Sequence, residues 1–91
     1  MQPSFNFKII TPQGTVFEGE AFHTLIPAED GFVGVLAHHA PYVTSSPGGR
    51  VELRGEEEGM EIEKKMKVGN GFFSVAWNQA FFLTKSFELE I

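Results

Sequence analysis

The chain has 91 residues, enough for one small domain with a single modest core. Its formal net charge is -5 and its seven basic residues are scattered, which argues against nucleic acid as a partner. There is no cysteine, so disulfide bonds and thiolate metal sites are excluded. No window approaches the ~18 apolar residues of a membrane-spanning helix, so we expect no direct membrane insertion.

Apolar and polar residues alternate with a period of two in several segments, which predicts strands with one buried and one wet face. The alternation begins over residues 5–9, recurs over 51–54 and 60–63, and closes the chain over 87–91, ending at Ile91. No stretch has the apolar spacing of an amphipathic helix. We therefore predict an all-β fold, a two-sheet antiparallel β-sandwich or flattened barrel of about nine or ten short strands.

Short turn signals separate these strands. The strongest is Asn70-Gly71, because a type I′ hairpin turn requires positive φ at both central residues and this pair adopts it cheaply. The others are Thr11-Pro12-Gln13-Gly14, Glu29-Asp30-Gly31, Pro47-Gly48-Gly49, Gly55 to Gly59 and Trp77-Asn78-Gln79. We expect antiparallel hairpins throughout.

Two segments, residues 72–77 and 80–85, are apolar on both faces. This predicts central strands that are covered by the core on one side and by a neighbour or a partner on the other. The side chains that we expect to form the core are Phe5, Phe7, Ile9, Phe17, Leu25, Val33, Val35, Val51, Leu53, Ile62, Val75 and Leu83.

Residues 22–44 form the most informative stretch. Residues 29–31 predict a turn, residues 32–36 a short strand, and residues 37–41 an irregular corner, because Pro41 cannot donate a ladder hydrogen bond. Alternation puts Val33 and Val35 on one face and Phe32 on the other. If the valines are core, Phe32 is exposed at a loop tip as a contact residue; the alternative is that it caps the sandwich.

The polar residues of this stretch have structural interpretations. Glu29 and Asp30 resemble an acid pair for hydrolysis, but next to a glycine they are better interpreted as turn formers. The adjacent His38 and His39 point to opposite faces in extended backbone, which disfavours a shared metal ion. We interpret His39 as hydrogen-bonded to hold the corner. No nucleophile elbow or phosphate loop is present, so we predict no catalytic residue, metal or cofactor, and no enzyme activity.

The same stretch resembles the epsilon subunit of F-type ATP synthases, named delta in mitochondria. The shared features are an acidic-Gly turn, then Gly34-Val35-Leu36, then His39-Ala40-Pro41 followed by an apolar residue and threonine. Residues 11–19, 69–72 and 81–84 match further family segments, so the resemblance covers essentially the whole chain. It implies a central-stalk rotor subunit, itself not catalytic, that couples the gamma subunit to the membrane c-ring during proton- or sodium-driven ATP synthesis.

The resemblance also implies contact surfaces. Those implied for the polar loops of the c-ring are Glu29, Asp30, Gly31 and Phe32. Those implied for the gamma subunit are His39, Ala40, Pro41 and Tyr42. The expected location is the cytoplasmic face of a bacterial inner membrane, with an organellar equivalent as the second choice. The alternative function is a non-catalytic sandwich that binds carbohydrate or peptide.

Many members of this family continue into a C-terminal pair of helices, which in some bacteria binds ATP. The sequence ends at residue 91, and we expect residues 1–91 to be the sandwich domain without that helical hairpin, either natively or through truncation. No ATP binding is therefore expected.

Overall fold

The computed structural model describes residues 2–90, which form nine strands and no helix. The strands are β1 (Phe5–Thr11), β2 (Gly14–Ala28), β3 (Gly31–Leu36), β4 (Tyr42–Ser46), β5 (Gly49–Glu57), β6 (Met60–Val68), β7 (Gly71–Ala76), β8 (Gln79–Thr84) and β9 (Phe87–Glu90). The all-β prediction is confirmed. Ile91, predicted to end the last strand, lies outside the described residues. Within residues 2–90, no helix has the length and apolarity needed to cross a bilayer.

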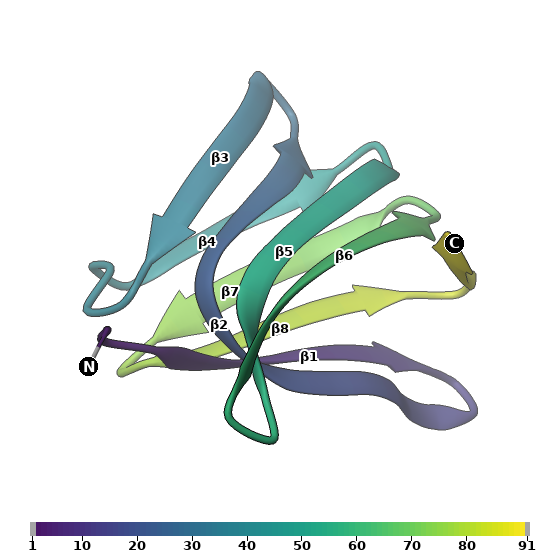
Figure 1. Ribbon diagram of the computed structural model, residues 1–91. Coiled ribbons are helices and arrows are strands. Elements are labelled where there is room, and N and C mark those ends of the chain that lie inside the picture. Colours follow the sequence, from purple (N-terminus) through teal and green to yellow (C-terminus); the bar gives the residue numbers. More distant parts are fainter. Residues whose placement is uncertain (1, 91) are drawn as a thin grey trace.

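The hydrogen-bonded strands follow the order β4-β7-β8-β1-β2-β5-β6-β9, with β3 also paired to β2. The long strand β2 joins the two layers, because residues 14–21 pair with β1, residues 23–28 with β3 and residues 20–25 with β5. Since β5 occupies one edge of β2, β1 and β3 follow each other along the opposite edge. In Figure 1, β5 and β6 consequently lie in front of β7 and β8. The described strands end at β4 and β9 without closing into a barrel, as in a sandwich.

Two details of the prediction are wrong, namely antiparallel pairing throughout and the hairpin turn at Asn70-Gly71. The first and eighth strands run parallel, with Phe7 opposite Ala80, so the sheet is not antiparallel throughout. The Asn70-Gly71 pair does not form a hairpin, because β6 pairs with β5 and β9 whereas β7 pairs with β4 and β8. Gly71 instead allows a close approach between strands, since a Cβ there would overlap the carbonyl oxygen of Leu83.

The two-residue turns with positive φ at both positions lie elsewhere. Glu58 and Gly59 have φ of 52° and 79° and connect β5 to β6. Trp77 and Asn78 have φ of 54° and 60° and connect β7 to β8. These are the backbone signs of type I′ hairpin turns.

The core lies between the two layers and is built around aromatic rings. Phe73 and Phe82, which were not predicted as core, are both fully buried at 0% exposure. The predicted core residues that are buried are Phe5, Phe7, Ile9, Val35, Val51, Leu53 and Val75. The predicted core residues that are partly buried and pack against this cluster are Phe17, Val33 and Ile62.

Two predicted core residues, Leu25 and Leu83, face outward. Leu83 is 47% exposed because Phe82 occupies the inward position of β8. Leu25 is half-buried at the surface, because a β-bulge in β2 shifts the alternation so that Thr24 and Ile26 point inward. The error at Leu83 arises in a segment that is apolar on both faces, where alternation cannot identify the inner side.

Candidate interaction surfaces

The outer side of the layer formed by β4, β7, β8 and β1 carries a cluster of apolar side chains. Leu83 lies opposite Phe72 on β7 and opposite Ile10 on β1, so three apolar side chains form a row across adjacent strands. Phe72 is 59% exposed and Val43, on the neighbouring strand β4, is 69% exposed. We call the outward side chains of Ile10, Val43, Phe72, Phe81 and Leu83 the apolar face. An exposed apolar cluster of this kind is typical of a surface that another molecule covers.

The apolar face is hollowed at one end. A depression of about 490 Å³ lies beside the Pro12 turn, and its lining includes Ile10, Phe72, Leu83 and Gly71. Because Gly71 has no side chain and lies against β8, the two strands stay close here. The depression offers an apolar recess for a side chain of a partner.

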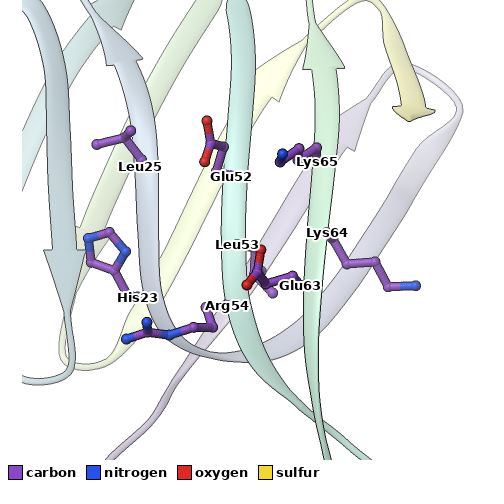
Figure 2. Close-up of a pocket in the computed structure, with 8 residues that line it drawn as sticks. All are labelled: His23, Leu25, Glu52, Leu53, Arg54, Glu63, Lys64 and Lys65. Atoms are coloured by element: carbon purple, nitrogen blue, oxygen red, sulfur yellow. The ribbon is translucent and has the colours of Figure 1, made fainter. Parts of the chain in front are cut away.

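The outer side of the other layer is charged. Glu52 lies opposite Lys65, and Arg54 lies opposite Glu63, so acids and bases alternate across β5 and β6. Figure 2 shows these side chains around a shallow hollow of about 170 Å³, with His23 at its rim. We call this side the charged face. Cross-strand pairs of opposite charge are typical of a solvated sheet surface. Residues 2–90 contain no group of three or more metal-ligating side chains placed to hold an ion.

The turn predicted to contact a c-ring connects β2 to β3, at the top of Figure 1. Gly31 has φ of 122°, a conformation that side chains rarely adopt. The carboxylate of Glu29 accepts a hydrogen bond from Ser45 Oγ at 3.0 Å, which ties the turn to β4. Phe32 is 64% exposed, as expected once Val35 is core. The predicted turn and the exposure of Phe32 are confirmed, whereas its contact with a ring stays a prediction.

The residues predicted to contact a gamma subunit connect β3 to β4, at the other end of β3. His39 Nδ1 lies 2.6 Å from the carbonyl oxygen of Ala40, and the ring of His39 meets that of Tyr42 edge-on at 6.0 Å between centroids. The prediction that His39 is hydrogen-bonded at this corner is confirmed. Ala40 and Pro41 are exposed, so their side chains are free to meet a partner.

The sequence analysis missed the most exposed aromatic side chain near this corner. Trp77, in the turn between β7 and β8, is 86% exposed. It lines a hollow of about 320 Å³ together with residues 38–41 and Asn78. The turn itself was predicted, but no signal in the sequence indicated that it would lie beside the His39 corner.

The fold and these surfaces define a β-sandwich domain with an exposed apolar cluster on one outer side and cross-strand charge pairs on the other. The family is shown by sequence comparison. The family model of the ATP synthase delta/epsilon chain β-sandwich domain matches residues 4–90, and the chain belongs to this family.

Individual relatives agree with the family match. The chain is 34% identical to the ATP synthase epsilon chain of Moorella thermoacetica, over 93% of this chain and 61% of the relative. It is 32% identical to the ATP synthase epsilon chain of Chlorobium limicola, over 90% of both chains. The chain thus spans about three fifths of the first relative and most of the second.

Solved structures support the same fold. A chain in the mitochondrial ATP synthase OSCP/F1/c-ring structure of Euglena gracilis superposes with a TM-score of 0.80 at 18% identity, covering 94% of this chain and 53% of that one. A chain in the central stalk/c-ring structure of Tetrahymena thermophila gives a TM-score of 0.73 at 12% identity, covering 91% and 64%. At these identities the likeness concerns the fold alone.

Proposed function

We propose that this chain is a central-stalk subunit of a rotary ATP synthase, which couples the gamma subunit to the c-ring during proton- or sodium-driven ATP synthesis. The observation that carries the proposal is the apolar face, in which Phe72 and Val43 are both more than half exposed. Exposing such a surface is unfavourable in a free protein but is expected of a subunit that another chain covers. Membership of the delta/epsilon family supports a stalk as that setting.

We propose that the gamma subunit covers the apolar face and the adjoining corner at residues 39–42. The c-ring loops would then meet the turn at residues 29–32, at the other end of β3. Torque between these partners must pass through the sandwich itself. A core of interlocked rings such as Phe7, Phe73 and Phe82, packed at crystal-like density, resists shear between the layers.

In this role catalysis belongs to other subunits of the complex. The acids and bases of the charged face occur as cross-strand pairs on an open surface, and a catalytic site calls for groups that converge in a water-excluding cleft. The chain would be peripheral to the membrane, on its cytoplasmic face in a bacterium. Exposed aromatics also suit a carbohydrate- or peptide-binding module, but docking of a subunit accounts for them within the family.

Co-expression with the gamma subunit of the same organism tests this function. We expect the two chains to co-purify, and we expect the isolated chain to hydrolyse no ATP. Failure to bind that gamma subunit, or ATP hydrolysis that follows the purified chain through successive columns, would contradict the proposed role.

Replacing Phe32 with aspartate tests the proposed ring contact. Because the ring is 64% exposed, we expect the melting temperature to change by only about 2–4 °C. Coupling between proton flow and ATP synthesis, measured with the complete complex in vesicles, should weaken because the variant adds a charge to the contact. Met60→Asp is the control, since Met60 is 71% exposed at a different hairpin. If Phe32→Asp unfolds the domain, or if both variants couple normally, the ring contact is misplaced.

A further inference from the structure

The two loops at the His39 end of the sandwich are joined to each other by hydrogen bonds. The backbone N–H of His38 donates to Asn78 Oδ1 at 2.6 Å, and Asn78 Nδ2 lies 3.4 Å from His38 Nδ1. The backbone N–H of Asn6 donates to the carbonyl oxygen of Asn78 at 2.9 Å. These contacts hold three segments that are distant in sequence in one arrangement, so this end presents a preformed surface.

Both loops carry large side chains in backbone conformations that favour glycine or asparagine. Trp77 has φ of 54° at the first central position of its two-residue turn, where Asn, Asp or Gly is preferred. His38 has φ of 66° in the turn that His39 N–H closes on the carbonyl oxygen of Leu36, at the position where type II turns favour glycine. Such backbone costs are usually offset by packing within the chain or by function.

Packing within the chain does not offset the cost at Trp77. Its side chain is 86% exposed, so little of the indole is removed from water. A smaller turn-forming residue would satisfy the local backbone better and would expose less apolar surface. The indole therefore fits a role in contact with another molecule, and tryptophan is among the side chains that most often dominate binding energy at protein interfaces.

The side chains around this hollow offer hydrogen-bond donors, and none of them is an acid. Asn78 Oδ1 accepts the backbone N–H of His38, so Asn78 Nδ2 faces His38 Nδ1 and donates to it. With Asn78 Nδ2 as the donor in this contact, Nε2 of a neutral His38 imidazole is the nitrogen that carries the proton. The exposed indole of Trp77 adds a second N–H, and the lining residues His38, His39, Ala40, Pro41, Trp77 and Asn78 include no acid. A complementary surface would supply hydrogen-bond acceptors.

We propose that the indole of Trp77 anchors the gamma subunit by entering an apolar recess of that subunit. The rim of this recess would carry carbonyl or carboxylate acceptors for the N–H groups of the indole and of His38. This inference rests on the proposed function and adds the residue that anchors the gamma subunit. Trp77 follows β7, the strand that carries Phe72, so the anchor lies at one end of the layer that bears the apolar face. The exposed corner at Ala40 and Pro41 lines the same hollow and would be covered together with it.

Trp77→Asn separates a binding role from a structural one. Asparagine suits a positive φ, so we expect the melting temperature to stay the same or rise. Affinity for the co-expressed gamma subunit, measured by titration calorimetry, should fall by at least about 30-fold, the scale of a binding hot spot. Trp77→Phe should retain part of the affinity, because the ring can still enter the recess without its N–H. Met60→Asn is the matched control at another exposed hairpin and should bind as the wild type does.

The outcomes distinguish the anchor from the proposed function. Wild-type affinity in Trp77→Asn, with gamma still bound by the wild-type chain, would overturn the anchor and leave the stalk role intact. A fall in melting temperature that accompanies the loss of affinity would assign Trp77 to the fold and also overturn the anchor. Failure of the wild-type chain to bind gamma would remove the proposed function and the anchor with it.

Discussion

Leu83→Asp is expected to abolish docking of the partner while leaving the sandwich folded. Leu83 is 47% exposed at the centre of the apolar face, between Phe72 and Ile10, so a carboxylate there stays hydrated in the free chain. In a complex the same carboxylate would be removed from water against an apolar partner surface, at a cost of several kcal/mol. We expect affinity for the gamma subunit to fall at least about 100-fold, which corresponds to about 2.8 kcal/mol.

Met60→Asp provides the control for this substitution. Met60 is 71% exposed at the hairpin between β5 and β6 in the other layer, so a carboxylate there also stays hydrated in the free chain. Binding measured by calorimetry and folding measured by circular dichroism should therefore separate the two variants. Equal losses of affinity in both, with both folded, would show that the apolar face is not the docking surface.

Phe82→Ala is expected to have the largest effect on stability. The ring of Phe82 is fully buried between Ile9 on β1 and Phe73 on β7, so its removal leaves a cavity in the centre of the core. A deletion of this kind costs about 3–5 kcal/mol, which is a large part of the 5–15 kcal/mol available to a typical domain. The melting temperature should fall by at least about 12 °C for a domain of this size.

The neighbouring variant Leu83→Ala supplies the comparison for Phe82→Ala. Because Leu83 faces outward and is half exposed, truncating it should cost about 1 kcal/mol or less in urea unfolding. A larger loss at Leu83 than at Phe82 would mean that the inner and outer faces of β8 are exchanged.

The sequence identified the faces of strands that have one apolar side. Along β1 and β5, Phe5, Phe7, Val51 and Leu53 were predicted as core and are buried, because the polar residues between them identify the wet face. Along β8, four consecutive apolar residues make both faces equally plausible from the local pattern. Only the long-range pairing of β8 with β1, which runs parallel, decides that Phe82 points inward.

Turn chemistry was informative about where the chain bends but not about which strands a bend connects. Asn70-Gly71 has the composition of a hairpin turn, yet it lies in the connection from β6 to β7, which are in different layers. Each of these strands therefore pairs with other segments of the chain. A local dipeptide holds no information about those partners. Trp77-Asn78 has weaker turn composition and forms the hairpin because β7 and β8 pair along their full length.

Features of the candidate surfaces that depend on neighbouring residues were predicted, whereas features that depend on contacts distant in sequence were not. The exposure of Phe32 follows from alternation with Val35 inside one short strand, and it was predicted. The hydrogen bond of His39 is to the next residue, and it was also predicted. The joint surface of His38 and Trp77 depends on a contact across 40 positions, between His38 and Asn78, and no local pattern encodes it.

Side-chain footprinting of the complex with the gamma subunit tests the proposed role most directly. Hydroxyl radicals oxidise exposed Phe, Leu, Trp and Met side chains, and Phe72, Leu83, Trp77, Met60 and Leu89 are all at least 44% exposed in the free chain. We expect binding to protect Phe72, Leu83 and Trp77 strongly while Met60 and Leu89 stay as reactive as before. Protection of Met60 and Leu89, with Phe72 and Leu83 still reactive, would contradict docking through the apolar face.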